Sequence, residues 1–272
     1  MTLYEPLISV IVTTYNRPVY LGNCLRSILK QSYVNFEIIV VSDGRNDENK
    51  VMIDSLQDSR LFYYELEHSG LPAISRNYGI TKSNGTYIAF CDDDDTWHDQ
   101  KLAIQEQFIR SNNCHFLFCD AYRIDAGGSL IVPFHPVLNS FIINTEKLLF
   151  RSKWYIYGKN YITLSSVVVH RELIDQINYC VNPNFRGSED YHFILKINYN
   201  YKLCYLDEKL VYYRVHEKNL SKSRKEGYQR SIEILSMLKN DNNISLGCQI
   251  IGKLIYYFKL SVVILIEKLS FK

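Results

Sequence analysis

Three features are scarce in this chain of 272 residues. Its seven cysteines form no CxxC pair and no even-numbered set, so we expect reduced cysteines in the core of a cytosolic protein. The formal net charge is only +2, which gives no reason to expect a nucleic-acid partner. No apolar run reaches the roughly 18 residues of a spanning helix, and the N-terminus lacks the basic segment of a signal peptide. The sequence therefore predicts a protein that works inside the cell.

Apolar residues, by contrast, are abundant. They make up 47% of the chain, with 22 Tyr and 13 Phe among them, which supports a sizeable core and argues against disorder. In the first half, apolar runs rich in β-branched and aromatic residues alternate with segments of helical spacing. The expected strands cover 7–15, 36–44, 60–66, 87–90 and 115–122. This alternation predicts an α/β protein with a mostly parallel, Rossmann-like sheet flanked by helices.

Polar or acidic clusters follow three of these strands. They read TTYNR at 13–17, SDGRND at 42–47 and DDDD at 92–95. Right-handed crossovers place the ends of successive parallel strands along one edge of a sheet, where ligands bind in such folds. We therefore expect the three clusters to converge on one site.

The second half is less regular. We expect a hairpin turn at Gly127-Gly128, a strong strand over 161–170 and a helix opened by GSED with Ser188 as N-cap. Residues 217–230 are basic and are expected to form a loop or a segment that becomes ordered on binding. The segment 244–271 is apolar, with lysines at 253, 259 and 268. It either packs on the domain as a core helix or lies on an anionic membrane surface.

The four consecutive carboxylates need an offsetting charge, since like charges this close repel one another. A solvated acidic loop is one interpretation, and an EF-hand loop fails at Trp97 and Ala103. The pattern Asp92-x-Asp94-x-Thr96 also fits haloacid-dehalogenase phosphatases, with Asp92 as the nucleophile. The remaining interpretation is a metal–diphosphate site, because Asp-x-Asp supplies the hard oxygen ligands that Mg²⁺ or Mn²⁺ prefers.

Five blocks in order resemble the family 2 glycosyltransferases: SVIVTTYNR, the strand ending in SDG, HSGLPAISRNYGI, GTYIAFCDDDDTW and GSEDYHFILKI. The resemblance covers roughly residues 6–220 and implies the GT-A fold and an inverting, UDP-sugar-dependent transferase. It implies a GT-A domain over 1–220, with a nucleotide-binding half at 1–125 and an acceptor and catalytic half at 126–220. A basic loop and an amphipathic helical segment would follow at 221–272.

The resemblance also assigns roles to individual positions. Thr13 and Tyr15 would line the uracil pocket, and Asp43 would accept a hydrogen bond from the base. Arg76 would lie near the uridine or the diphosphate. The usual family form at 42–47 is Asp-Asp-Gly-Ser-x-Asp, so Ser42 is left out of the site and the role of Asp47 stays open.

The acidic positions complete the implied site. Asp94 would bind Mn²⁺ or Mg²⁺ directly, with Asp92 at the ribose or the metal and His216 completing the metal shell or touching the diphosphate. Asp93 is assigned only a ribose contact, and Asp95 faces the sugar or the acceptor. The late pair Glu189-Asp190 would supply the catalytic base, with Asp190 on the first turn of its helix.

Enzymes that the chain resembles extend sugars in the assembly of bacterial O-antigen and capsular polysaccharides. The resemblance suggests UDP-glucose or UDP-galactose as donor and an N-acetylhexosamine on a polyprenyl diphosphate as acceptor. The protein would then lie in the cytoplasm, with peripheral association at the inner face of the plasma membrane through its C-terminal segment. Two alternatives stay open at this point, the phosphatase and a non-catalytic nucleotide-sugar binding module.

Overall fold

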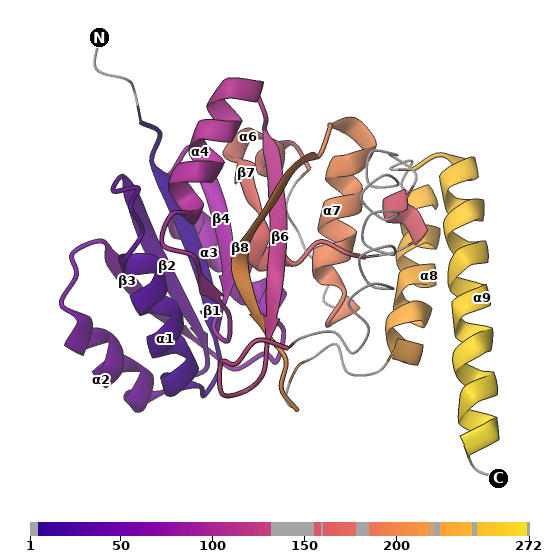
Figure 1. The fold of residues 1–272 in the computed structure, drawn as a ribbon, viewed down its shortest axis with the longest axis horizontal. Coiled ribbons are helices and arrows are strands. Elements are labelled where there is room, and N and C mark those ends of the chain that lie inside the picture. Colours follow the sequence, from indigo (N-terminus) through magenta and orange to yellow (C-terminus); the bar gives the residue numbers. More distant parts are fainter. Residues whose placement is uncertain are drawn as a thin grey trace. The chain divides into compact units, whose positions relative to one another are not determined.

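The computed structural model describes residues 5–131, 155–158, 160–177, 185–217, 219, 224–240 and 244–270, with side chains in the last segment up to residue 264. Figure 1 shows the helices and strands of the chain, which divides into two compact units. The first takes its residues from 1–130, 162–183 and 202–215, and the second from 131–161, 184–201 and 216–272. The division at residue 220 expected from the sequence stays a prediction.

The first unit is built on an eight-stranded sheet with the strand order β3-β2-β1-β4-β7-β6-β8-β5. Six strands run in one direction, and only β7 and β5 run the other way, so the mostly parallel sheet is confirmed. The strands are β1 (Ile8–Thr14), β2 (Phe36–Asp43), β3 (Leu61–Leu66), β4 (Tyr87–Asp92), β5 (Thr96–Trp97), β6 (Phe116–Ile124), β7 (Val168–His170) and β8 (Cys204–Arg214).

Helices connect the parallel strands of this unit, and local sequence explains where two of them begin. α1 (Pro18–Leu29) and α3 (Pro72–Lys82) each start at a proline, whose missing N–H is not needed in a first helical turn. α2 (Asp47–Leu56) is capped by Asn46, which accepts the backbone N–H of Asn49. The remaining helices are α4 (Lys101–Asn112), α6 (Arg171–Gln176) and the 3-10 helix η2 (Leu164–Ser166).

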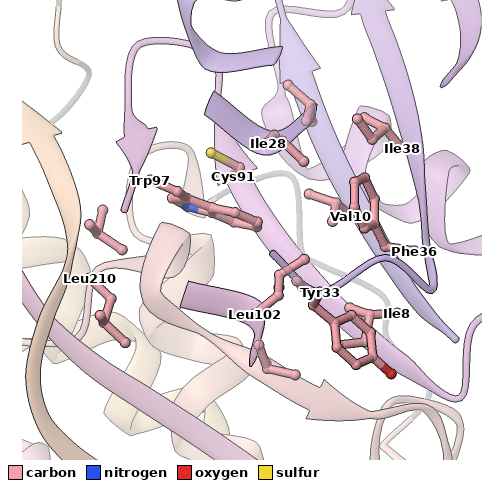
Figure 2. Packing of buried hydrophobic residues seen from close by; sticks show 14 of the residues in the cluster. Ile8, Val10, Ile28, Tyr33, Phe36, Ile38, Cys91, Trp97, Leu102 and Leu210 are labelled. Atoms are coloured by element: carbon pink, nitrogen blue, oxygen red, sulfur yellow. The ribbon is translucent and has the colours of Figure 1, made fainter. Parts of the chain in front are cut away.

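A cluster of buried apolar side chains lies between one face of the sheet and helices α1, α2 and α4. Strand residues such as Val10 and Ile38 meet Ile28 of α1, while Trp97 and Leu102 close the core beside β4 (Figure 2). These side chains are almost fully buried. The apolar runs that predicted the strands are therefore the residues that hold the carboxyl ends of β1, β2 and β4 in place.

The second unit is helical in the part that the structure describes. It contains the 3-10 helix η1 (Tyr155–Gly158), α7 (Glu189–Asn200), α8 (Arg224–Asn240) and α9 (Leu246–Ser270). α8 packs along α9, and η1 lies against α9 where Gly252 meets the carbonyl oxygen of Tyr157. A side chain at Gly252 would clash there, since its Cβ would lie 2.6 Å from that oxygen.

Four expectations need correction. Only Val168–His170 of the segment 161–170 forms a strand, because Leu164–Ser166 turns into a 3-10 helix. The basic segment 217–230 is not all loop, since α8 begins at Arg224. Cys114 and Cys204 form a disulfide, although all the cysteines were expected to be reduced. No spanning helix was expected from the uninterrupted apolar runs of the sequence. By the criteria of length and composition alone, however, Leu246–Ile264 of α9 could cross a membrane.

Candidate active site

The three polar clusters converge at the carboxyl ends of β1, β2 and β4, as expected. The hydroxyl of Thr14, at the end of β1, donates to Asp93 Oδ2 at 2.7 Å. Asn46, which follows β2, donates through its side chain to Asn16 Oδ1 at 2.8 Å. Residues from the TTYNR, SDGRND and DDDD motifs are therefore joined by direct hydrogen bonds.

Arg17 provides part of the charge that offsets the aspartates. Its guanidinium lies 2.9 Å from Asp94 Oδ2 and 3.2 Å from Asp93 Oδ1. The Asp93 side chain is almost fully buried, and desolvation, followed by the charge of Asp94, raises the pKa of Asp93 to about 7. Arg17 is the last residue of TTYNR, and no role was predicted for it from the sequence.

Asp92 has a separate cationic partner. Arg76, on α3, donates through Nη2 to Asp92 Oδ1 at 2.8 Å. The arginine side chain is 8% exposed and the aspartate side chain 34% exposed, so the pair leaves one face of Asp92 in contact with solvent. Arg76 therefore orients an accessible carboxylate at the point where β4 ends.

Asp95 faces the interior of the protein. It is fully buried, and its two oxygens accept the Ser165 hydroxyl at 2.6 Å and the Arg214 backbone N–H at 2.9 Å. Desolvation, followed by the charges of Asp94 and Asp92, raises its pKa well above the ordinary value. The Arg214 side chain also donates to the carbonyl oxygen of Asp94 at 2.8 Å. The contact of Asp95 with a sugar or acceptor stays a prediction, and the structure adds a role in holding the acidic turn.

A second cluster surrounds Asp43 at the end of β2. The backbone N–H groups of Ser69 and Gly70 donate to the Asp43 carboxylate at 2.7 and 2.8 Å, and the Ser69 hydroxyl donates at 2.8 Å. Tyr15 is 46% exposed and stacks on His68, with ring centroids 4.2 Å apart. Gly70 has a φ of +70°, which glycine adopts without strain. The structure thus places an aromatic face beside a carboxylate that is already bound to the loop 68–70.

Thr13 lies next to these two clusters. It is half-buried in β1, paired with Val41 of β2 on one side and Asp92 of β4 on the other. Its assignment to a uracil pocket, like those of Tyr15 and Asp43, stays a prediction. No role was predicted for His68, because it lies in the loop after β3 and is identified by tertiary contacts, its stacking on Tyr15 and its contact with Asp43.

The acid cluster contains two carboxylates suited to a divalent cation. Among the described residues, no group of three or more His, Cys, Asp or Glu side chains is arranged to hold a metal. Mg²⁺ and Mn²⁺ at diphosphate sites need fewer protein ligands, since one or two carboxylates are completed by waters and phosphate oxygens. Asp92 and Asp94 fit that requirement as hard oxygen ligands at a strand end.

The remaining predicted residues belong to the second unit. Glu189 and Asp190 begin α7, and Asp190 accepts hydrogen bonds from the Asn160 amide at 3.4 Å and from the Tyr191 N–H at 2.7 Å. Ser188 precedes the helix but makes no side-chain cap. The backbone N–H of His216 donates to Asn219 Oδ1 at 2.6 Å. The catalytic role of the acidic pair and the metal role of His216 stay predictions.

Comparison with known proteins identifies the family. The model for glycosyl transferase family 2 matches residues 9–171. TuaG of Bacillus subtilis, a glycosyltransferase assigned provisionally to teichuronic acid biosynthesis, is 31% identical over 192 residues, 70% of this chain and 71% of TuaG. WfgD of Escherichia coli is 25% identical over 231 residues, 84% of this chain and 85% of WfgD. The chain also matches three Rickettsia glycosyltransferases but spans only 19%, 23% and 22% of their length.

Solved structures share the fold. The mannosyltransferase PcManGT from Pyrobaculum calidifontis, in complex with GDP-Man and Mn²⁺, superposes with a TM-score of 0.68 over 95% of this chain and 70% of that protein, at 17% identity. S. aureus TarS in complex with UDP-GlcNAc gives 0.66 over 86% of this chain and 66% of that structure, at 23% identity. The chain therefore belongs to glycosyl transferase family 2, with the GT-A fold and the enzyme class, a glycosyltransferase, that its sequence predicts.

Proposed function

We propose that this chain transfers a hexose, glucose or galactose, from a UDP-sugar to a hydroxyl group of a sugar acceptor, with inversion at the anomeric carbon. The observation that carries the proposal is the cluster Asp92–Asp95, held by Arg17 and Arg76 at the carboxyl ends of parallel strands. Such strand ends are where open α/β sheets bind nucleotides. The family match also gives residues 9–90 a role, which the phosphatase alternative did not.

The acceptor is proposed to be an N-acetylhexosamine on a polyprenyl diphosphate, in bacterial surface polysaccharide synthesis. WfgD supports this choice by its name, a UDP-Glc:alpha-D-GlcNAc-diphosphoundecaprenol beta-1,3-glucosyltransferase. TuaG supports the link to cell-surface polymers. The acceptor and the donor sugar are both part of the proposal.

The reaction divides between the predicted residues as follows. The acceptor oxygen forms a bond to the anomeric carbon while the bond from that carbon to the UDP oxygen breaks. Asp190 takes the proton of the acceptor hydroxyl, and Glu189 lies beside it at the start of α7. Arg76 and Asp92 orient the nucleotide end of the donor, with Tyr15 against the base. A Mn²⁺ or Mg²⁺ ion held by Asp92 and Asp94 would neutralise charge on the departing diphosphate.

A donor panel tests this function. UDP-glucose, UDP-galactose, UDP-GlcNAc and GDP-mannose are each incubated with Mn²⁺, with and without a lipid-linked N-acetylglucosamine diphosphate, and nucleotide release is measured. We expect UDP release from a UDP-hexose that requires both the metal and the acceptor. Release of GDP alone would contradict the UDP assignment, and phosphate release from simple phosphomonoesters would support the phosphatase instead.

α9 provides the basis for a membrane partner. Eight large apolar side chains of this helix are exposed, and only 17% of Leu246–Ile264 is buried. The charged residues among its described side chains, Lys253 and Lys259, are both half-buried. The exposed apolar residues are Leu246, Ile250, Ile251, Leu254, Ile255, Tyr257, Phe258 and Val262.

We infer that this face lies on the inner surface of the plasma membrane, where a lipid-linked acceptor is found. Apolar and aromatic side chains enter the headgroup region, and the charge of Lys253 favours anionic lipid. Flotation with vesicles containing anionic phospholipid tests this: the unsubstituted protein should float, and a Leu254→Ser, Phe258→Ser double variant should not. Val51→Ser is a matched control, since Val51 is an exposed apolar residue of α2. Equal flotation of the double variant and the control would contradict membrane binding through α9.

A further inference from the structure

Ser165 lies between two of the four aspartates and binds both. It is fully buried in η2, about 70 residues further along the chain than the acid cluster. Its hydroxyl donates to Asp95 Oδ2 at 2.6 Å and accepts the backbone N–H of Asp92 at 3.1 Å. One hydroxyl group thus uses its proton and a lone pair to join the first and last residues of the DDDD turn.

Buried side chains bind the backbone of η2, the segment that contains Ser165. The Trp97 indole N–H donates to the Ser165 carbonyl oxygen at 3.0 Å, and the Gln105 side chain donates to the Ser166 carbonyl oxygen at 2.9 Å. Lys101 donates to Gln105 Oε1 at 2.7 Å and lies 3.8 Å from the Trp97 ring centroid. All of these groups are buried, so η2 is a fixed support for the turn.

We propose that Ser165 is a positioning residue, whose hydroxyl fixes the Asp92 backbone and the Asp95 carboxylate and thereby sets where the Asp92 and Asp94 carboxylates meet the metal–diphosphate group of a nucleotide sugar. The inference rests on the proposed function, because it concerns the same site. Ser165 itself does not touch the acidic side chains predicted to bind the metal. It acts through the shape of the turn that presents them.

Removal of the hydroxyl should loosen the turn at both ends. In Ser165→Ala, Asp95 Oδ2 and the Asp92 N–H each lose their buried partner, and unsatisfied buried groups are costly. The other oxygen of Asp95 remains bound to the Arg214 N–H, so the carboxylate keeps one attachment. Substitution of a residue that orients metal ligands through hydrogen bonds typically lowers metal affinity by about 10- to 100-fold.

Ser166 offers a matched control one residue away. It is also fully buried, but its hydroxyl donates to the Thr163 carbonyl oxygen at 2.7 Å within the same segment. Ser166→Ala therefore removes a buried hydroxyl of η2 without removing a hydrogen bond to the aspartates. A purely structural role for Ser165 predicts that the two alanine variants behave alike.

The experiment measures binding and stability together, on the full chain. Mn²⁺ is titrated in the presence of UDP and followed by loss of the free-ion EPR signal, and UDP affinity is measured by calorimetry. We expect Ser165→Ala to weaken Mn²⁺ and UDP binding by about tenfold. Ser166→Ala should bind both within about twofold of the unsubstituted protein. The two alanine variants should lose similar amounts of Tm. Equal affinities in the two alanine variants would overturn the inference while leaving the proposed function intact.

A second pair of variants provides the test if Ser165→Ala does not fold. Ser165→Thr and Ser165→Val are nearly equal in volume, but only threonine keeps the hydroxyl group. The threonine variant should bind Mn²⁺ and UDP like the unsubstituted protein, and the valine variant should bind about tenfold more weakly. If only threonine allows folding, the hydroxyl serves the fold and the positioning role fails. No binding of Mn²⁺ and UDP by the unsubstituted protein would overturn the proposed function itself.

Discussion

The two acidic motifs of this chain are held in different ways. The carboxylates of Asp92–Asp95 are bound by groups distant in the sequence, from Thr14 and Arg17 to Arg214. The pair Glu189-Asp190 lies at the start of one helix, and the amide of Asn160 and the adjacent Tyr191 N–H bind Asp190. The carboxylate contacts described for the first motif reach up to 119 residues along the chain, and those described for Asp190 reach 30 residues.

The two motifs are predicted to carry out two chemical tasks. Carboxylates that face a metal and a diphosphate have to stay ionised and in place, and guanidinium partners favour both. A general base has to take a proton from the acceptor hydroxyl and lose it again. The two motifs can therefore be separated by substitution: one should control binding, and the other should control turnover.

The largest expected effect is the loss of the predicted metal ligand. Asp94→Asn should lower sugar transfer by about a thousandfold and remove the dependence of UDP binding on Mn²⁺, because the neutral amide binds the cation poorly. Initial rates over a Mn²⁺ series measure both. Asp58→Asn is the control, since Asp58 pairs with Arg60 in the turn before β3 and should leave the rate unchanged. A metal-dependent rate in Asp94→Asn near that of the unsubstituted protein would contradict the assignment.

The free energy of unfolding should depend on pH through His192, which lies on the same helix as Glu189 and Asp190. His192 of α7 is 3% exposed, and desolvation, followed by the charge of Lys196, lowers its pKa from 6.5 to about 4. Between these pH values the unfolded chain binds a proton that the folded chain does not. The free energy of unfolding should therefore fall as the pH drops from 6.5 to 4, by up to roughly 3 kcal/mol.

His192→Leu tests this pH dependence. The variant should lose that part of the acid sensitivity in urea unfolding followed by circular dichroism at several pH values. His115→Leu should keep it, because His115 is exposed. Identical pH slopes for the unsubstituted protein and His192→Leu would show that the buried histidine is not the cause.

A smaller effect is expected at the partner of Asp92. Arg76→Met removes the guanidinium that orients this carboxylate and should weaken UDP binding by about tenfold, as expected for the loss of a charged hydrogen bond. Calorimetric titration with UDP measures it. Arg60→Met removes an arginine from a surface pair and should leave UDP affinity unchanged. If both variants bind UDP equally, Arg76 does not support the nucleotide site.

The sequence predicted the sheet and the convergence of the three polar clusters for a physical reason. Apolar runs such as 7–15 and 36–44 are buried on both faces and can form little else, and polar residues follow directly where these strands end. The convergence of TTYNR, SDGRND and DDDD then follows from parallel topology. Their direct hydrogen bonds confirm it.

The residues that form hydrogen bonds with the aspartates could not be predicted in the same way. Ser165 and Arg214 lie 70 and 119 residues beyond Asp95, and no local pattern marks them. Residues 161–170 look like one continuous strand, so Ser165 was expected to pair within a sheet rather than to turn toward the acids. His68 lies in a loop whose conformation depends on Asp43. Contacts of this kind are set by tertiary packing.

The most direct test of the division between binding and turnover is Asp190→Asn. UDP affinity in the presence of Mn²⁺ and the rate of sugar transfer are measured on the same preparation. We predict unchanged UDP affinity, within about twofold, and a rate lowered by about a hundredfold or more, because asparagine cannot accept the proton of the acceptor hydroxyl. Transfer at the rate of the unsubstituted protein would contradict the account, since the base would then lie elsewhere.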